Sequence, residues 1–228
     1  MKFTQPNYLH IEKLLDSEEV ALIQRLAQEA EYADGKVSAS AEAAKVKHNL
    51  QAKDGSLSMQ RMQNVIMKAI SRRQEIQKAI LPKMILPPLI TQYHDGMTYG
   101  MHVDSPLMGS QYTIRTDVGM TLFLSEPESY EGGELLVLTE VGEKRFKLPP
   151  GDAVLYPTTK LHEVIPVTSG NRLVAVTWMQ SAIRDPAQRE MLSILNQATA
   201  SVAENGLKEE HLALQQVYAN LVRMWAEL

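Results

Sequence analysis

The sequence predicts an α+β fold in which an antiparallel jelly-roll core carries helices at both ends of the chain. Short β-rich runs separated by glycine, proline and polar turns fill the middle of the chain, a pattern typical of an antiparallel sandwich or barrel. Apolar residues at helical spacing come before and after this part. We expect a helical support region over 1–83, the main β domain over 84–182 and a helical extension over 183–228.

The N-terminal region is expected to hold two helices. Asp16 and Glu19 form a capping-box pattern that predicts a helix to about residue 31. An extended segment is expected over 46–51. Apolar positions at helical spacing predict a second helix over 57–80, ended by a proline. We interpret the first of these helices as scaffold.

The β domain begins after the two prolines at 87–88 and continues to about Met179. Two helices are expected to close the chain, one opening at Asp185-Pro186 and one running from about Lys208. Eight β-rich runs suggest a jelly roll: LITQYHD, YGMHVD, VGMTLFLS, GELLVL, KRFKLP, DAVLYP, LHEVIPV and RLVAVTWMQ.

Composition excludes several classes of partner. The net charge of −4 gives no general attraction to a polyanion, so nucleic acid is not expected. The first fifteen residues have no signal-peptide pattern, and no apolar run is long enough to cross a membrane. The absence of cysteine leaves imidazole and carboxylate as metal ligands and fits a cytoplasmic protein. Assembly into a homo-oligomer stays open.

Two residues in the second β-rich run can bind one metal ion together. His102 and Asp104 are two apart, so in a strand their side chains point to the same face. His162 lies on a later run and can supply the third ligand. Two histidines and one carboxylate on one face of Fe(II) leave positions free for a 2-oxo acid and O2. The ordinary alternative is a hydrogen-bonded pair on a strand.

Arg172, ten residues after His162, suits a carboxylate. Its guanidinium offers two parallel donors, which match the far carboxylate of 2-oxoglutarate while the keto-acid end chelates iron. Val174, Val176 and Trp178 share its strand face, so we expect that face to be buried. A buried arginine needs an anion. The alternative is a salt bridge on the sandwich surface.

Three long strings carry a resemblance to a known family: YHDGMTYGMHVDSP, RTDVGMTLFLSEPESYEGGELLV and LPPGDAVLYPTTKLHEVIPVTSGNRLVAVTWMQS. Together with the helix start at Arg184-Asp185 they resemble the bacterial PKHD-type hydroxylases, Fe(II)/2-oxoglutarate-dependent dioxygenases related to the prolyl 4-hydroxylase catalytic domain. The resemblance covers nearly the whole chain. It implies a double-stranded β-helix in a dioxygenase domain, and coupling of 2-oxoglutarate decarboxylation to hydroxylation of an undefined substrate.

The resemblance also implies roles for particular residues. His102, Asp104 and His162 would be the iron ligands, with Arg172 as the 2-oxoglutarate anchor. Tyr93 stands where the prolyl-hydroxylase pattern has a tyrosine that bonds to the co-substrate carboxylate. A further tyrosine of some relatives is replaced by Phe123, which removes a hydroxyl. Family members are described as ascorbate-binding, with L-ascorbate returning oxidised iron to Fe(II).

Other readings remain. A cupin-like metal-binding or sensing protein would keep the three metal ligands without oxidation, but has no evident need for the arginine. A zinc hydrolase has no well-placed general base, because Glu163 neighbours His162 and faces away. His94 is expected to be structural. The segment 105–117 is expected to be a solvated loop with a local ion pair between Arg115 and Asp117, with a substrate lid as the alternative. Asn49 and Gln51 are two further candidates for polar contacts near the mouth of the site.

Overall fold

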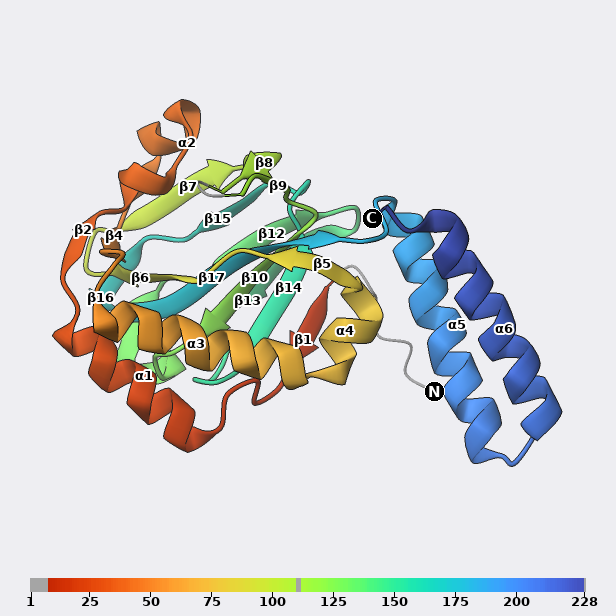
Figure 1. The fold of residues 1–228 in the computed structure, drawn as a ribbon. Coiled ribbons are helices and arrows are strands. Elements are labelled where there is room, and N and C mark those ends of the chain that lie inside the picture. The colour runs from red at the N-terminus through yellow and green to blue at the C-terminus, as the bar shows by residue number, and fades with distance from the viewer. Residues whose placement is uncertain (1–7, 110–111, 228) are drawn as a thin grey trace.

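The computed structural model describes residues 8–109 and 112–227, and two facing antiparallel sheets form its centre (Figure 1). The N-terminal strands are β1 (Leu9–Ile11), β2 (Tyr32–Asp34), β3 (Lys47–His48), β4 (Leu50–Ala52), β5 (Pro82–Ile85), β6 (Leu89–Tyr93), β7 (Thr98–His102) and β8 (Leu107–Met108). The later strands are β9 (Ile114–Arg115), β10 (Val118–Phe123), β11 (Tyr130–Gly132), β12 (Leu135–Thr139), β13 (Gly142–Phe146), β14 (Ala153–Pro157), β15 (His162–Val164), β16 (Val167–Gly170) and β17 (Arg172–Ser181). The helices are α1 (Ser17–Glu29), α2 (Ala41–Lys45), α3 (Leu57–Arg72), α4 (Gln74–Ile80), α5 (Pro186–Glu204) and α6 (Lys208–Trp225), with short 3-10 turns η1 (Gly35–Ser38) and η2 (Pro127–Ser129).

The larger sheet has the strand order β1-β14-β10-β17-β6-β4-β2, with β5 also paired to β17. The smaller sheet has the order β13-β12-β15-β7-β3. Several strands that are neighbours in one sheet are far apart in sequence, as in the pairing of Leu9 with Leu155. The predicted antiparallel jelly roll is therefore confirmed, and each sheet turns one face toward the other (Figure 1).

Helices α1 and α3 cover the outer face of the larger sheet (Figure 1). The predicted capping box starts α1, because the Glu19 N–H donates to Asp16 Oδ1 at 2.9 Å and the Asp16 N–H donates to Glu19 Oε2 at 3.1 Å. The two helices bury apolar side chains against the sheet; those of α1 include Ile23 and Leu26, and those of α3 include Ile66 and Ile70. This outer core fixes the back of the larger sheet.

Two expectations for the N-terminal region need correction. The single helix predicted over 57–80 is two helices, because Arg73 leaves helical geometry with φ −85° and ψ 105°. Its guanidinium donates to the carbonyls of Glu12 and Lys13, contacts that helical periodicity does not reveal. The expected extended segment over 46–51 forms β3 and β4, but β1, β2 and the start of β5 also come from this region, so it is not only a helical support.

The C-terminal helices α5 and α6 form a hairpin beside the sandwich (Figure 1). Asp185 caps α5 as expected, with its Oδ1 accepting the Ala187 N–H at 2.7 Å. The Glu227 carboxylate at the other end pairs with Arg115 at 2.8 Å and Arg184 at 2.9 Å. Among the described residues, no helix is long and apolar enough to cross a membrane.

Candidate active site

A cavity lies between the two sheets and contains all five side chains that the sequence singled out. It encloses about 710 Å³ of space, part of it open to solvent. Its lining includes His102, Asp104, His162, Arg172 and Tyr93, which span eighty positions of the chain. The larger sheet contributes β6 and β17, and the smaller sheet contributes β7 and β15. The expected constellation is therefore one site in space.

The antiparallel pairing of β7 with β15 sets the three candidate metal ligands side by side. His102, the last residue of β7, is directly opposite His162, the first residue of β15, and their ring centroids are 4.3 Å apart. Asp104 follows two residues after β7 ends, and its Oδ1 lies 3.8 Å from His162 Nε2. One ligand atom from each residue falls within 4.8 Å of the others, a spacing that one metal ion can bridge.

Backbone carbonyls orient both imidazoles. His102 Nδ1 is 2.8 Å from the Gly100 carbonyl, and His162 Nδ1 is 2.9 Å from the Lys160 carbonyl. A carbonyl can only accept, so each Nδ1 carries its hydrogen and each Nε2 keeps a free lone pair. The ring of Tyr99 stacks on His102 at 3.6 Å between centroids. The rings are thus held in the form that binds a metal.

Burial disfavours the charged forms of His102 and Asp104. It lowers the pKa of His102 to about 3, with the neighbouring His162 acting in the same direction. It raises the pKa of Asp104, although the imidazole of His162 opposes the rise. Asp104 Oδ2 is buried without a hydrogen-bond partner. A divalent cation would satisfy that oxygen and stabilise the carboxylate, so the donor set fits ferrous iron.

Arg172 is a buried cation that pairs with no carboxylate in the described part of the chain. The residue is 1% exposed, and no described residue is a hydrogen-bond partner of its Nε or Nη1. Its Cζ lies 5.0 Å from the centroid of the Tyr93 ring and 5.7 Å from that of Phe123. Tyr93 is opposite Arg172 in the pairing of β6 with β17. Two free donors aimed from one wall of the cavity fit a carboxylate, as 2-oxoglutarate binding requires.

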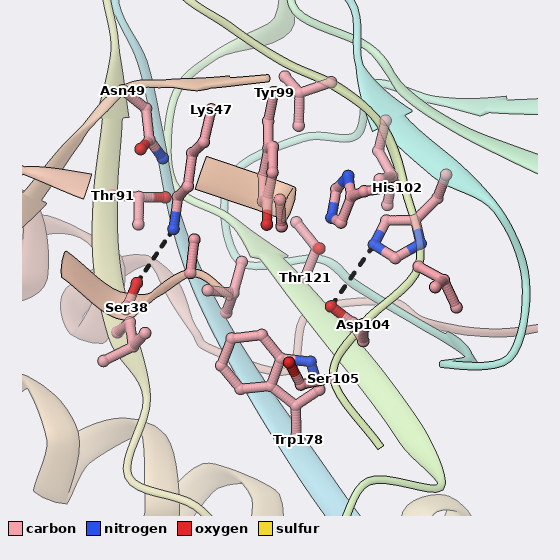
Figure 2. Close-up of a pocket in the computed structure, with 18 of the residues that line it drawn as sticks. Ser38, Lys47, Asn49, Thr91, Tyr99, His102, Asp104, Ser105, Thr121 and Trp178 are labelled. Atoms are coloured by element: carbon pink, nitrogen blue, oxygen red, sulfur yellow. Dashed lines mark hydrogen bonds and ion pairs between the residues drawn. The ribbon is translucent and has the colours of Figure 1, made fainter. Parts of the chain in front are cut away.

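The rest of the Arg172 face is buried only near the arginine, so the prediction of a buried face holds in part. Val174 is 1% exposed, whereas Val176 and Trp178 are partly exposed and line the cavity farther along β17. Trp178 lies beside Asp104 in Figure 2. Phe123 is 1% exposed and adds no hydroxyl near the arginine. This wall therefore presents an apolar surface with a single fixed cation.

The other residues considered in the sequence lie at different distances from the cavity lining, and most of them do not contribute to it. His94 lies outside the cavity, with its Nε2 3.1 Å from Gln92 Oε1. Arg115 and Asp117 form the expected ion pair, with Nε 2.7 Å from Oδ1, and neither lines the cavity. Part of the segment 105–117 does line it, through Ser105 and Met108, while residues 110–111 fall outside the described residues.

The sequence indicates Asn49 as a candidate site residue but assigns no role to nearby Lys47. Both line the cavity, together with Ser38 and Thr91 (Figure 2). Gln51, the other residue named with Asn49, instead accepts a hydrogen bond from Ser38 at 2.6 Å. A signal was available, because positions 47, 49 and 51 alternate on one face of an extended segment.

Comparison with known proteins agrees with this geometry. Residues 88–180 match the model of the 2OG-Fe(II) oxygenase superfamily, and residues 186–227 match that of the PKHD-type hydroxylase C-terminal domain. A prolyl-4-hydroxylase from Pseudomonas putida shares the fold with a TM-score of 0.56 at 17% identity, over 77% of this chain and 92% of that one. A prolyl hydroxylase from Trichoplax adhaerens also gives 0.56, at 16% identity, over 83% of this chain and 88% of that one. The jelly roll is therefore the double-stranded β-helix of these oxygenases.

Whole-length relatives are much closer in sequence. A PKHD-type hydroxylase from Pseudomonas putida is 42% identical over 227 residues, covering 96% of this chain and 99% of the relative. One from Synechococcus sp. is 43% identical over 222 residues, and one from Escherichia coli is 40% identical over 222 residues, each with the same coverage. The chain belongs to the PKHD-type hydroxylases of the Fe(II)/2-oxoglutarate-dependent oxygenase superfamily.

Proposed function

We propose that His102, Asp104 and His162 hold the ferrous iron of this hydroxylase and that Arg172 and Tyr93 hold the distal carboxylate of 2-oxoglutarate. The observation that carries the proposal is the pairing, in one cavity, of a three-ligand cluster with a buried arginine whose two donors are free. A metal-binding sensor would not need that arginine. When bound, iron and 2-oxoglutarate supply the activation of O2 and the hydroxylating chemistry, with succinate and CO2 as by-products.

The chain's own groups prepare the site for that chemistry. The carbonyls of Gly100 and Lys160 keep each histidine's Nε2 free to bind. Arg172 and Tyr93 orient the co-substrate from the opposite sheet, so its other end is directed toward the metal ligands. Val176 and Leu135 line the same cavity and exclude water. The protein thus positions the metal and the co-substrate, supplies the charge of Arg172 and excludes water from the cavity.

Three further assignments rest on this function. O2 and 2-oxoglutarate are the co-substrates that the family implies. We propose that L-ascorbate supports repeated turnover by returning the metal to Fe(II), and that the primary substrate is a peptide or protein side chain or a small molecule. A cytoplasmic location, the absence of a nucleic-acid partner and assembly into a homo-oligomer stay predictions. Ascorbate is tested by following succinate over many turnovers with and without it.

The decisive experiment is anaerobic loading with Fe(II) and 2-oxoglutarate, followed by exposure to O2 and measurement of succinate. Wild type should retain iron and form succinate, at a rate that a true substrate raises. Asp104→Asn keeps the shape of the side chain but removes its charge, so iron retention and succinate formation should both fall. Wild-type protein that takes up neither iron nor 2-oxoglutarate would refute the assignment.

A further inference from the structure

The cavity holds a second buried cation, on the sheet opposite Arg172. Lys47 is 7% exposed and lies on β3, where it pairs with Tyr99 of β7. Its Nζ donates to Ser38 Oγ at 3.0 Å and lies 5.0 Å from the centroid of the Tyr99 ring. Within the described part of the chain, no carboxylate lies within ion-pair distance of this ammonium. Two of its three N–H groups are left for something else.

Two more unpartnered polar groups lie beside this lysine. Asn49 is 2% exposed, and within the described residues neither its Oδ1 nor its Nδ2 has a hydrogen-bond partner of good geometry. The same holds for Oγ1 of Thr91, which is also 2% exposed. The hydroxyl of Tyr93 lies near both side chains. Figure 2 shows both side chains in the same part of the pocket as Lys47. Leaving buried polar groups unpaired is costly, so such a cluster indicates a missing ligand.

The charges of the cavity specify the sign of that ligand. Apart from the two histidines, its charged lining residues are Asp104, Arg172 and Lys47. The formal charges of ferrous iron, Asp104, Arg172 and the dianionic co-substrate together sum to zero. Lys47 then remains as one uncompensated positive charge in a buried place. Burial also lowers the pKa of Lys47 to about 8, so a neighbouring anion would stabilise its charged form.

We propose that Lys47, Asn49 and Thr91 form a subsite for a carboxylate of the primary substrate. The ammonium, the amide N–H and the hydroxyl supply donors to its two oxygens. The proposal rests on the proposed function, because it places the hydroxylated molecule in the same cavity as the metal ligands. It predicts that the substrate carries a negatively charged group near the carbon that is hydroxylated. A free small acid and an acidic side chain of a peptide share this chemistry.

Binding can be followed with Trp178, which lines the cavity, after the other tryptophan is removed by Trp225→Phe. Protein loaded anaerobically with Fe(II) and saturating 2-oxoglutarate is titrated with butyrate at constant ionic strength, and with butyramide as the uncharged control. We expect butyrate to change the fluorescence saturably and butyramide to do so far more weakly. Equal responses to the two, or no response to butyrate, would overturn the subsite.

Variants assign the response to the lysine. Lys47→Met should weaken butyrate binding by at least about tenfold, as expected for loss of a hydrogen bond to a charged group, and should leave 2-oxoglutarate affinity unchanged. Lys47→Arg should restore part of the binding. Lys45→Met is the matched control, because Lys45 lies in the same segment but is exposed and paired with Glu42. Wild-type butyrate affinity in Lys47→Met would refute the proposal.

Two further probes complete the test. Tighter binding of inorganic phosphate than of butyrate would overturn the assignment to a carboxylate. A blocked Ala-Glu-Ala peptide separates the sources, since its binding favours a peptide substrate and binding of butyrate alone favours a free acid. Succinate measured on the same samples separates the two proposals. Succinate formation without carboxylate binding rejects only the subsite, whereas iron-loaded protein that forms no succinate rejects the function.

Discussion

Replacing Arg172 with methionine should make the protein without co-substrate more stable while removing its ability to bind 2-oxoglutarate. Arg172 is 1% exposed, and two of its nitrogens lack partners. A buried unsatisfied donor costs about 1–3 kcal/mol, and methionine fills similar space with no donor. The loss of the contact with the Tyr93 ring, about 1 kcal/mol, acts in the opposite direction. For the two donors together we therefore expect a net gain of about 1–5 kcal/mol.

Thermal unfolding measures both the stability without co-substrate and the stabilisation by 2-oxoglutarate. For a chain of this size about 1 kcal/mol shifts Tm by roughly 2–4 °C, so Arg172→Met without 2-oxoglutarate should melt several degrees above wild type. With 2-oxoglutarate at about a hundred times its Kd, metal-loaded wild type should gain about 2.7 kcal/mol. The variant should gain nothing, so 2-oxoglutarate moves the Tm of wild type toward or past that of the variant. Metal content, measured in parallel, should be equal.

Arg189→Met is the matched control. Arg189 is also buried, but its Nη1 donates to the carbonyls of Ile183 and Arg184, each at 2.8 Å. Its replacement leaves those carbonyls unpaired, so it should lower Tm and leave the response to 2-oxoglutarate intact. Two results would contradict this account of Arg172: a lower Tm for Arg172→Met than for wild type in the absence of co-substrate, or a rise in the Tm of the variant with 2-oxoglutarate.

Three further predictions follow from single contacts. His162→Ala should abolish iron retention and succinate formation, and a fully active variant would mean that the third ligand is another residue. Gly133→Ala should weaken 2-oxoglutarate binding with iron content unchanged, because Gly133 has φ +69° and a Cβ there would lie 3.0 Å from Arg172 Cδ; unchanged affinity in calorimetry would contradict this. Arg72 holds the pKa of Glu19 below its usual 4.5 through a hydrogen bond, so that pair stabilises the fold above pH 4.5 and its contribution is lost as the pH falls through the lowered pKa. Arg72→Gln should therefore flatten the acid side of the stability profile, and superimposable profiles from urea unfolding would count against it.

The candidate site was largely predictable from sequence because its chemistry restricts residue types and its strands impose spacing. His102 and Asp104 needed only the two-residue alternation of an extended chain. His162 and Arg172 were recognisable as an imidazole and a guanidinium on later β-rich runs. The direct pairing of His102 with His162 was not, because cross-strand register depends on contacts among distant strands. The residue roles and the region boundaries at 83 and 182 stay predictions.

The N-terminal strands could not be predicted in the same way. Strands β1, β2 and β4 have three residues each and β3 has two, which is too short for alternation to stand out. Their partners also lie far away in sequence, as for β1 with β14. Lys47 escaped notice for a related reason, since a lysine on a short strand is normally solvated. Helix α2 and turn η1 pack against β3, and Lys47 is buried there with its Nζ bonded to Ser38 of η1.

Asn49 marks the place where the chain passes from one sheet to the other. It separates β3, an edge strand of the smaller sheet, from β4, which belongs to the larger one. A Cβ on Gly35 would lie 1.9 Å from Asn49 Oδ1, so η1 packs directly over this crossing. Segment 35–52 therefore closes one side of the cavity, whereas the candidate iron and co-substrate residues come from β6, β7, β15 and β17 and the residues beside them. Because the chemistry and this wall belong to separate parts of the chain, the wall can change with the substrate while the metal ligands stay fixed. The proposed subsite takes Lys47 and Asn49 from this wall and Thr91 from β6, so substrate selection in this enzyme should follow Lys47 and Asn49 more closely than the metal ligands.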